Sequence, residues 1–162
     1  MEIVEATEKD IRVIHELAEK IWWPTYRPIL SEEQISFMLE HMYSEKALNE
    51  QMLADTRFIL VKSNNEVVAF AGYSTETRPE SVLKIHKIYV LPSEQGKGTG
   101  KNLLEHLLNI AKDLTIRQVE LNVNRANPAL GFYKKLGFEI YKTVDIPYYQ
   151  FILNDYVMRK NI

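Results

Sequence analysis

The amino-acid sequence predicts a mixed α/β fold, in which a mostly antiparallel β-sheet is flanked by helices on both sides. The first observation behind this prediction is that the spacing of apolar residues alternates along the chain between two periods. Segments whose apolar residues recur every three or four positions alternate with segments whose apolar residues recur at every second position. The second is a strand-like run, a glycine-rich turn and a helix start at residues 88–100, which predict a parallel crossover in an otherwise antiparallel sheet. The expected order is strand, two or three helices, three strands, helix, strand, helix and two strands.

The N-terminal segment predicts a short strand at residues 2–6, followed by a helix. Thr7 is the expected N-cap, and Asp10 stands at the capping-box position. Because proline lacks an N–H and collides with the preceding helical turn, we expect Pro24 and Pro28 to end this helix. Its buried stripe is expected at Ile11, Ile14, Leu17, Ala18 and Ile21.

Two further helices are expected to begin at the serine caps Ser31 and Ser44. The buried stripe of the first would be Ile35, Met38, Leu39 and Met42, and the second would hold Leu48, Met52 and Leu53. The turn before Ser31 is rich in aromatic residues, and its two prolines make full burial awkward. We therefore expect Trp22, Trp23 and Tyr26 to form a partly exposed wall of a substrate site. The alternative is that these three residues belong to the core. Tyr148, in the last loop, would form the opposite wall.

Two β-rich runs, 58–61 and 67–73, are joined by Asn64 and Asn65 and predict a hairpin, because asparagine tolerates the left-handed backbone of such turns. The next strand is expected at residues 82–91. Its apolar positions slip by one, from Leu83 and Ile85 to Ile88 and Val90. That slip predicts a β-bulge between residues 85 and 88, and bulges often lie beside active sites.

Residues 92–100 form a glycine-rich turn, with glycines at 96, 98 and 100. Glycine permits positive φ and a close approach of the backbone to a ligand, and the helix start that follows presents unpaired N–H groups. This combination predicts an anion cradle, most naturally for phosphate, with a purely structural turn as the alternative. The spacing fits neither the P-loop nor the dinucleotide fingerprint.

The rest of the chain continues the alternation of helices and strands. Asn127 is the expected cap of a helix that Gly137 ends in the left-handed conformation. The elements are expected at residues 103–114 (helix), 119–123 (strand), 128–136 (helix), 138–141 (strand) and 150–158 (strand).

Composition narrows the class of protein. The 162 residues suit a single domain, residues 1–162, and the net charge of −2 offers no basic field for nucleic acid or an anionic membrane. Cysteine is absent, which excludes disulfides and thiolate catalysis. Without a signal-peptide pattern or an apolar run of membrane-spanning length, we expect a cytoplasmic protein. His15, His41 and His106 lack metal-ligand spacing, so no metal is expected.

Two motifs together resemble the GNAT superfamily of N-acetyltransferases. The first is Gln/Arg-x-x-Gly-x-Gly/Ala, met by Gln95, Gly98 and Gly100, which in that family holds coenzyme A. The second is residues 127–138, similar to Asn-x-x-Ala-x-x-Phe-Tyr-x-x-x-Gly-Phe, although alanine stands at 129 rather than 130. The motifs occur in the family's order, and the expected elements match the GNAT fold over essentially the whole chain.

The resemblance implies a site for acetyl-CoA. Backbone N–H groups of the glycine-rich turn, with Lys97 or Lys101 nearby, would hold the pyrophosphate. The main chain of the preceding strand would pair with the pantetheine arm like an added strand. Asn127 would hydrogen-bond the cofactor, and Tyr133 would supply a proton to the departing thiolate. The implied cofactor-binding residues are Ile88, Tyr89, Val90, Gln95, Gly96, Lys97, Gly98, Thr99, Gly100, Lys101, Asn127 and Tyr133.

Acetyl transfer to an amine also needs a proton acceptor, because a lysine-like amine with a pKa of about 10.4 is almost entirely protonated at pH 7. His86 is the candidate base, since it precedes the glycine-rich turn and an unperturbed imidazole has a pKa near 6.5. Many related acetyltransferases have a glutamate in this place. Glu76, Glu120 or an ordered water chain are the alternatives to His86.

The expected function is acetyl-CoA-dependent N-acetylation of a primary amine, with a small amine such as a polyamine or an amino acid favoured. Glu32, Glu33 and Asp145 offer carboxylates that would attract a cationic acceptor, although acidic residues at a helix start also act as caps. A peptide N-terminus or lysine is the alternative acceptor. A non-catalytic acyl-CoA-binding module is the alternative class, and a homodimer is expected.

Overall fold

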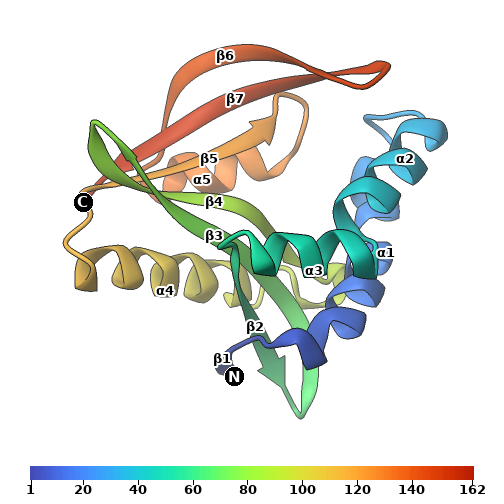
Figure 1. Cartoon of the computed structure of the whole chain (residues 1–162), viewed down its shortest axis with the longest axis horizontal. Helices are drawn as coiled ribbons and strands as arrows, with labels where there is room; N and C mark the ends of the chain where they lie inside the picture. Colours follow the sequence, from blue (N-terminus) through green and yellow to red (C-terminus); the bar gives the residue numbers. More distant parts are fainter. The chain divides into compact units, whose positions relative to one another are not determined.

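The computed structural model describes residues 1–162, which form seven β-strands and five α-helices (Figure 1). The strands are β1 (Glu2–Glu5), β2 (Arg57–Ser63), β3 (Glu66–Arg78), β4 (Glu80–Val90), β5 (Gln118–Asn124), β6 (Glu139–Tyr148) and β7 (Phe151–Asn161). The helices are α1 (Ile11–Tyr26), α2 (Glu32–Tyr43), α3 (Glu45–Leu53), α4 (Thr99–Asp113) and α5 (Ala129–Lys135). The strands form a mixed sheet in the order β1-β2-β3-β4-β5-β7-β6, which confirms the predicted fold class. None of the helices combines the length and hydropathy needed to cross a membrane.

The chain divides into two compact units. The first unit comprises residues 1–74 and 87–104, and the second comprises residues 75–86 and 105–162. The borders between them fall inside β3, β4 and α4. The prediction that residues 1–162 act as one domain stays a prediction.

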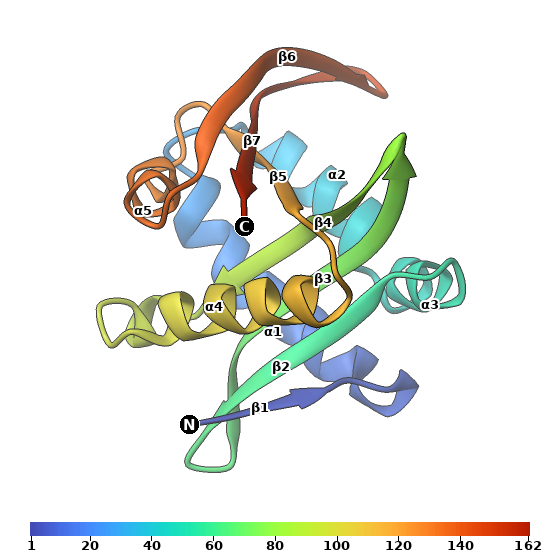
Figure 2. The same ribbon diagram turned by 90° about the vertical axis from the view of Figure 1, so that its left-hand side faces the viewer.

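The first unit opens with the edge strand β1, which pairs antiparallel with β2 (Figure 2). Thr7 and Asp10 form the predicted capping box, which begins a short 3₁₀ turn that leads directly into α1. The prediction that Pro24 ends this helix is wrong, because α1 continues to Tyr26. The hydroxyl of Thr25 donates to the carbonyl of Ile21 at 2.7 Å, and burial of the last-turn side chains holds the helix together past the missing N–H.

The serine caps and the asparagine turn of the first unit are confirmed. Ser31 accepts from the N–H of Gln34, and Ser44 accepts from the N–H of Ala47, each at 3.1 Å. Asn64 and Asn65 both have positive φ between β2 and β3, as a tight hairpin turn requires. The helices α1, α2 and α3 pack against one another in this unit (Figure 1).

The second unit is built on β5, which pairs parallel with β4 and antiparallel with β7. The parallel register runs from Val82 opposite Gln118 to Ile85 opposite Leu121. The bulge expected between residues 85 and 88 of β4 stays a prediction. The strands β6 and β7 form a long hairpin that reaches Tyr148 and Phe151, longer than the sequence predicted (Figure 1). Its proline, Pro147, lies in the edge strand β6, where a missing N–H costs least.

Helix α5 ends as predicted at Gly137, whose φ of +93° is in the left-handed region. The N–H of Gly137 donates to the carbonyl of Lys134, and that of Phe138 donates to the carbonyl of Tyr133. The ammonium of Lys160 donates to the carbonyl of Leu136 at 2.6 Å. A β-carbon added to Gly137 would lie 2.7 Å from that ammonium.

We expect Gly137→Ala to lower the free energy of unfolding by about 1–2 kcal/mol, because alanine is strained at this φ and displaces the Lys160 cap. The measurement is urea denaturation at pH 7. Gly131→Ala is the matched control within α5, since an added β-carbon there meets nothing within 4 Å and alanine favours the helix. Equal destabilisation by both changes would contradict this account of the cap.

Candidate active site

The glycine-rich turn lies in the first unit, between the end of β4 and the start of α4. A 3₁₀ turn at Pro92–Glu94 comes first, and Gly96 and Gly98 then have φ values of +83° and +84°. A β-carbon added to either glycine would meet no atom within 4 Å, so the backbone there is open to a ligand. The predicted cradle of exposed main chain before a helix start is therefore present.

Polar groups around this turn suit an anion. The side chain of Thr99, at the first position of α4, is buried, and its hydroxyl has no hydrogen-bond partner. Lys97 is exposed and lies 3.8 Å from the carboxylate of Glu94. The first turn of a helix leaves N–H groups unpaired and carries a positive dipole end. An unsatisfied hydroxyl and open backbone at that end fit a pyrophosphate group.

The end of β4 supplies the residues expected to pair with the pantetheine arm. Ile88, Tyr89 and Val90 are half-buried. The side-chain amide of Gln95 reaches back toward the carbonyl of Val90 at 3.4 Å. The hydroxyls of Tyr89 and Tyr26 lie 2.9 Å apart and share a hydrogen bond. The strand is thus anchored to α1 beside the glycine-rich turn.

An aromatic cluster surrounds that anchor, and it consists of Trp22, Tyr26, Tyr43, Phe70 and Tyr89. The expectation of a partly exposed wall is wrong for Trp22 and Tyr26, which are 3% and 6% exposed. Both residues lie on the buried face of α1, which continues past Pro24 to Tyr26. Trp23 is half-buried, with the Arg27 guanidinium 5.2 Å from its ring, so it alone of the three keeps partial exposure.

The cluster also encloses Lys87, which the sequence analysis missed. Lys87 is 8% exposed, and its ammonium lies 4.3 Å from the centre of the Tyr43 ring. Burial lowers the pKa of Lys87 to about 8. The available signal was the place of this lysine between Ile85 and Ile88, where the apolar alternation of the strand slips by one.

The second unit holds the two residues expected to move protons. His86 lies on β4 and is exposed. Tyr133 lies on α5 and is 7% exposed, and its ring packs against Phe132 and Phe138. Asn127 caps the start of the same helical segment, because its side-chain oxygen accepts from the N–H of Ala129 at 2.9 Å.

Glu120 is a buried carboxylate on β5 that is held by three cationic side chains. Lys84 and Arg159 each donate to it, at 2.9 and 2.8 Å, and Arg78 donates at 3.1 Å. Burial favours the neutral acid, but hydrogen bonds from Lys84 and Arg159 outweigh it and lower the pKa of Glu120 to about 2. Glu76 pairs with the same Arg78. Such a carboxylate is a poor proton acceptor, which argues against Glu120 as the base.

The remaining predicted substrate residue, Tyr148, lies at the end of β6 and is half-buried. Its ring centre lies 5.0 Å from that of Tyr149, which occupies the hairpin turn with a φ of +54°. Burial and the neighbouring Tyr149 raise the pKa of Tyr148. The two rings give the tip of the β6–β7 hairpin an aromatic surface.

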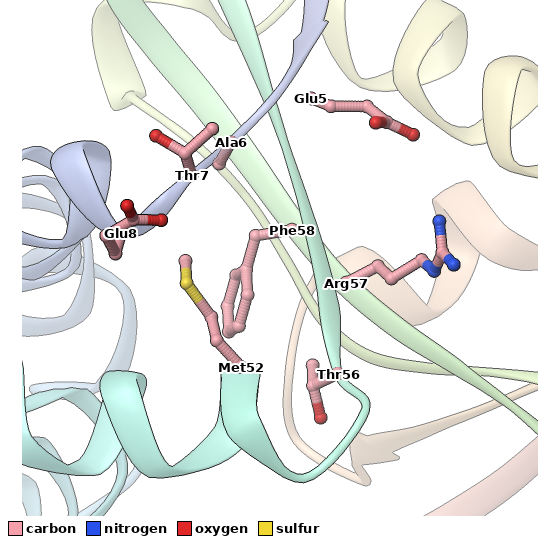
Figure 3. A pocket seen from close by; sticks show the side chains of 8 residues that line it. All are labelled: Glu5, Ala6, Thr7, Glu8, Met52, Thr56, Arg57 and Phe58. Atoms are coloured by element: carbon pink, nitrogen blue, oxygen red, sulfur yellow. The ribbon is translucent and has the colours of Figure 1, made fainter.

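A pocket of about 290 Å³ lies elsewhere in the first unit (Figure 3). Its lining comes from β1, β2 and the ends of neighbouring helical segments: Glu5, Ala6, Thr7, Glu8, Met52, Thr56, Arg57 and Phe58. None of the implied cofactor-binding residues lines it, so it is separate from the candidate active site. The structure contains no cluster of three side chains suited to hold a metal ion.

Comparison with known proteins adds both sequence and fold similarity. The profile of the acetyltransferase (GNAT) family matches residues 15–138. The spermidine N(1)-acetyltransferase of Thermoplasma acidophilum is 30% identical over 149 residues, which are 88% of this chain and 91% of that protein. A peptidyl-lysine N-acetyltransferase of Salmonella typhimurium is 44% identical over 54 residues, which are 33% of this chain and 34% of that protein.

Among solved structures, the PaiA N-acetyltransferase from Thermoplasma acidophilum, in complex with coenzyme A, has a similar fold. The TM-score is 0.86 at 25% sequence identity, and the match covers 99% of this chain and 98% of that one. Similarity to the two Thermoplasma acidophilum proteins therefore covers most of this chain.

We expect Glu120→Gln to lower the free energy of unfolding at pH 7 by about 3 kcal/mol, because it leaves three cations without their buried carboxylate. In the parent chain this stabilisation is complete above pH 4.5 and is lost as the pH falls toward 2. The measurement is urea denaturation at several pH values, with the exposed Glu139→Gln on β6 as the control. A difference from the parent that grows as the pH falls from 4.5 to 2 would contradict this assignment.

Proposed function

This chain belongs to the acetyltransferase (GNAT) family, and we propose that it transfers the acetyl group of acetyl-CoA to a primary amine of a small molecule, such as a polyamine or an amino acid. The observation that carries the proposal is its likeness to a spermidine N(1)-acetyltransferase over 88% of this chain and 91% of that protein. The family profile spans residues of both compact units. Residues 1–162 would accordingly act as one acetyltransferase domain.

Acetyl-CoA, the acyl donor of the family, supplies an activated acetyl thioester when bound. In this chain the backbone of Gly96 and Gly98, the first turn of α4 and the unpaired hydroxyl of Thr99 would hold its pyrophosphate. Lys97 and Lys101 are exposed beside that turn and would add positive charge. The main chain of residues 88–90 would pair with the pantetheine arm, as the family resemblance implies. The neighbour in the solved structures that carries coenzyme A supports this cofactor.

Two side chains would move the protons of the reaction. His86, exposed on β4, would accept a proton from the acceptor ammonium, directly or through water. Tyr133, on α5, would give a proton to the departing thiolate. The side-chain oxygen of Asn127 accepts from the N–H of Ala129. Its side-chain amide also has two N–H donors, and these would bind the cofactor. The carboxylate alternatives are weaker, because Glu76 and Glu120 both lie in the ion-pair network of Arg78.

The acceptor would be cationic. Glu33 is exposed at the start of α2, and Glu32 beside it is only loosely paired with Arg27, at 3.9 Å. Asp145, by contrast, is engaged by Arg125 at 2.6 Å, so its charge is already compensated. Trp23 and Tyr148 offer half-buried aromatic surface for the carbon chain of an amine. These features favour an aliphatic amine.

A protein lysine or N-terminus is the second candidate acceptor. The observation that favours it is the likeness to a peptidyl-lysine N-acetyltransferase over 54 residues, at 44% identity. That match covers only 33% of this chain, so it bears on a shared segment rather than on the whole acceptor site.

We also propose that the protein works as a homodimer in the cytoplasm.

The test of the proposed function is thiol release from acetyl-CoA across polyamines including spermidine, amino acids, aminoglycosides and short peptides, with cofactor binding measured in parallel. We expect turnover with aliphatic amines. Turnover confined to peptides would replace the small-amine proposal with the peptide one. Tight cofactor binding without turnover on any acceptor would favour a non-catalytic binding module.

We expect Tyr133→Phe to lower the rate of thiol release by roughly 10²–10⁴-fold while coenzyme A binding is kept, because the ring packing remains and only the proton donor is lost. Steady-state kinetics and calorimetric titration with coenzyme A provide the two readings. Phe132→Leu, the neighbouring half-buried position of α5, is the control for altered packing. Unchanged turnover in Tyr133→Phe would remove the tyrosine from the mechanism.

We expect His86→Ala to lower the rate and to remove the acidic limb of its pH profile, because the imidazole must be neutral to accept a proton. The half-buried His106 of α4 is not part of the proposed site, and His106→Ala should leave the profile unchanged. The measurement is the rate of thiol release between pH 6 and 9. A His86→Ala profile identical to that of the parent would rule the histidine out as base.

A further inference from the structure

Lys87 is the one buried lysine of the chain, and its setting is unusual for a cation. No carboxylate oxygen lies within ion-pair distance of its amine, whereas Lys84 on the same strand is bound to Glu120 and Asn122. The contact of its amine is with the face of the Tyr43 ring, 4.3 Å from the ring centre. A lysine is seldom buried without a charged partner, because desolvation of the ammonium is costly.

The surroundings of Lys87 are aromatic. Rings of Trp22, Phe70 and Tyr89 lie 5.3, 6.2 and 6.3 Å from the ring of Tyr43, centre to centre. The indole N–H of Trp22 is buried and makes no hydrogen bond of good geometry, although it lies close enough to the Tyr43 hydroxyl to oppose the rise in that group's pKa. The site thus combines flat apolar walls with an unused donor. The face of the Tyr43 ring attracts the ammonium, but burial without a carboxylate favours the neutral amine.

Lys87 also stands next to the segment proposed to hold the acetyl donor. It directly precedes Ile88, the first of the three residues whose main chain would pair with the pantetheine arm. Both lie in the first unit, on the last residues of β4. The four-carbon stem of lysine gives its amine several ångströms of reach from the strand.

We propose that Lys87 is a site of self-acetylation, at which the side-chain amine takes the acetyl group from the chain's own bound acetyl-CoA. This inference rests on the proposed cofactor, but it does not depend on which amine is the external acceptor. The lone pair of the neutral amine forms a C–N bond with the thioester carbonyl carbon, and the C–S bond breaks with its electron pair on sulfur. The proton lost by nitrogen ends on that sulfur, so the products are an N-acetyl-lysine and free coenzyme A.

The protonation state of Lys87 favours this reaction over reaction at an exposed lysine. With a pKa of about 8, roughly one amine in ten is neutral at pH 7, against fewer than about one in a thousand for an ordinary lysine. The aromatic groups around it that can titrate are the hydroxyls of Tyr26, Tyr43 and Tyr89. Burial raises the pKa of Tyr43, so that group remains neutral over the working range.

The product would also fit its site. Acetylation removes the charge whose burial is unfavourable and leaves an amide that can lie on the Tyr43 ring. Its carbonyl oxygen can accept from the indole N–H of Trp22, which makes no hydrogen bond of good geometry in the unmodified chain. The modified side chain would therefore be held inside the cluster.

The experiment uses the full-length chain with acetyl-CoA and no added amine, followed over time by intact mass and by mass spectrometry of its peptides. We expect one acetyl group at Lys87, formed at least about tenfold faster than at any exposed lysine. The rate at Lys87 should rise about fivefold from pH 7 to 8 and level off above, whereas acetylation of exposed lysines keeps rising tenfold for each pH unit. The chain unfolded in urea should lose this preference.

Matched variants separate the site from its surroundings. Lys87→Arg keeps the charge but cannot be acetylated in this way, and Lys87→Met removes both charge and amine. Lys84→Arg, on the same strand, should be acetylated at Lys87 like the parent. Thermal unfolding of each variant shows whether it is folded, and loss of the acetyl group in either folded Lys87 variant supports the assignment.

The outcomes distinguish this inference from the proposed function. Coenzyme A binding and amine turnover with no acetyl group at Lys87 would overturn the self-acetylation and leave the acetyltransferase proposal standing. Acetyl groups spread evenly over exposed lysines would overturn it as well. Acetylation of Lys87 without turnover of any amine would support the inference and contradict the small-amine proposal.

Discussion

The structure depends on a constraint at one place, the open backbone between β4 and α4. A strand has to give up its hydrogen-bonding pattern and a helix has to begin with its first N–H groups unpaired, within a few residues. Gly96 and Gly98 meet this constraint because their positive φ values cost glycine little and because no side chain covers the main chain there. The half-buried end of β4 and the buried hydroxyl of Thr99 flank the same turn. We propose that this open main chain binds the pyrophosphate of the cofactor.

The chain holds two buried charged side chains in opposite ways, one in each compact unit. Glu120 has three cationic partners, and their hydrogen bonds keep it ionised far below its usual pKa. Lys87 has an aromatic face instead of a carboxylate, and its pKa falls toward neutrality. The first arrangement keeps the carboxylate charged and links side chains of β4, β5 and β7 by hydrogen bonds. The second leaves an amine that is readily neutral, which is the state that chemistry with an acyl donor requires.

Local signals in the sequence predicted much of the fold. Caps at Thr7, Ser31 and Ser44, the asparagine turn and the end of α5 at Gly137 depend on residues close in sequence, and all of them are confirmed. The glycine-rich turn was found for the same reason.

Features set by long-range packing were missed. Pro24 lies inside α1, since burial of Trp22 and Tyr26 outweighs a single missing hydrogen bond. The aromatic cluster around Lys87 consists of residues from α1, α2, β3 and β4, which are far apart in the sequence, so no local pattern predicts it. Glu120 is a possible base by residue type alone, but its three cationic partners come from other strands and argue against that role. The proton-transfer roles of His86 and Tyr133 stay proposals.

Binding of coenzyme A by the glycine-rich turn can be tested directly by amide hydrogen exchange with and without coenzyme A. We expect slower exchange at residues 88–90 and 95–101, where main-chain N–H groups would bind the cofactor, and little change at residues 5–8 and 52–58, which include the lining of the separate pocket. Protection at that pocket with none at the glycine-rich turn would contradict the account.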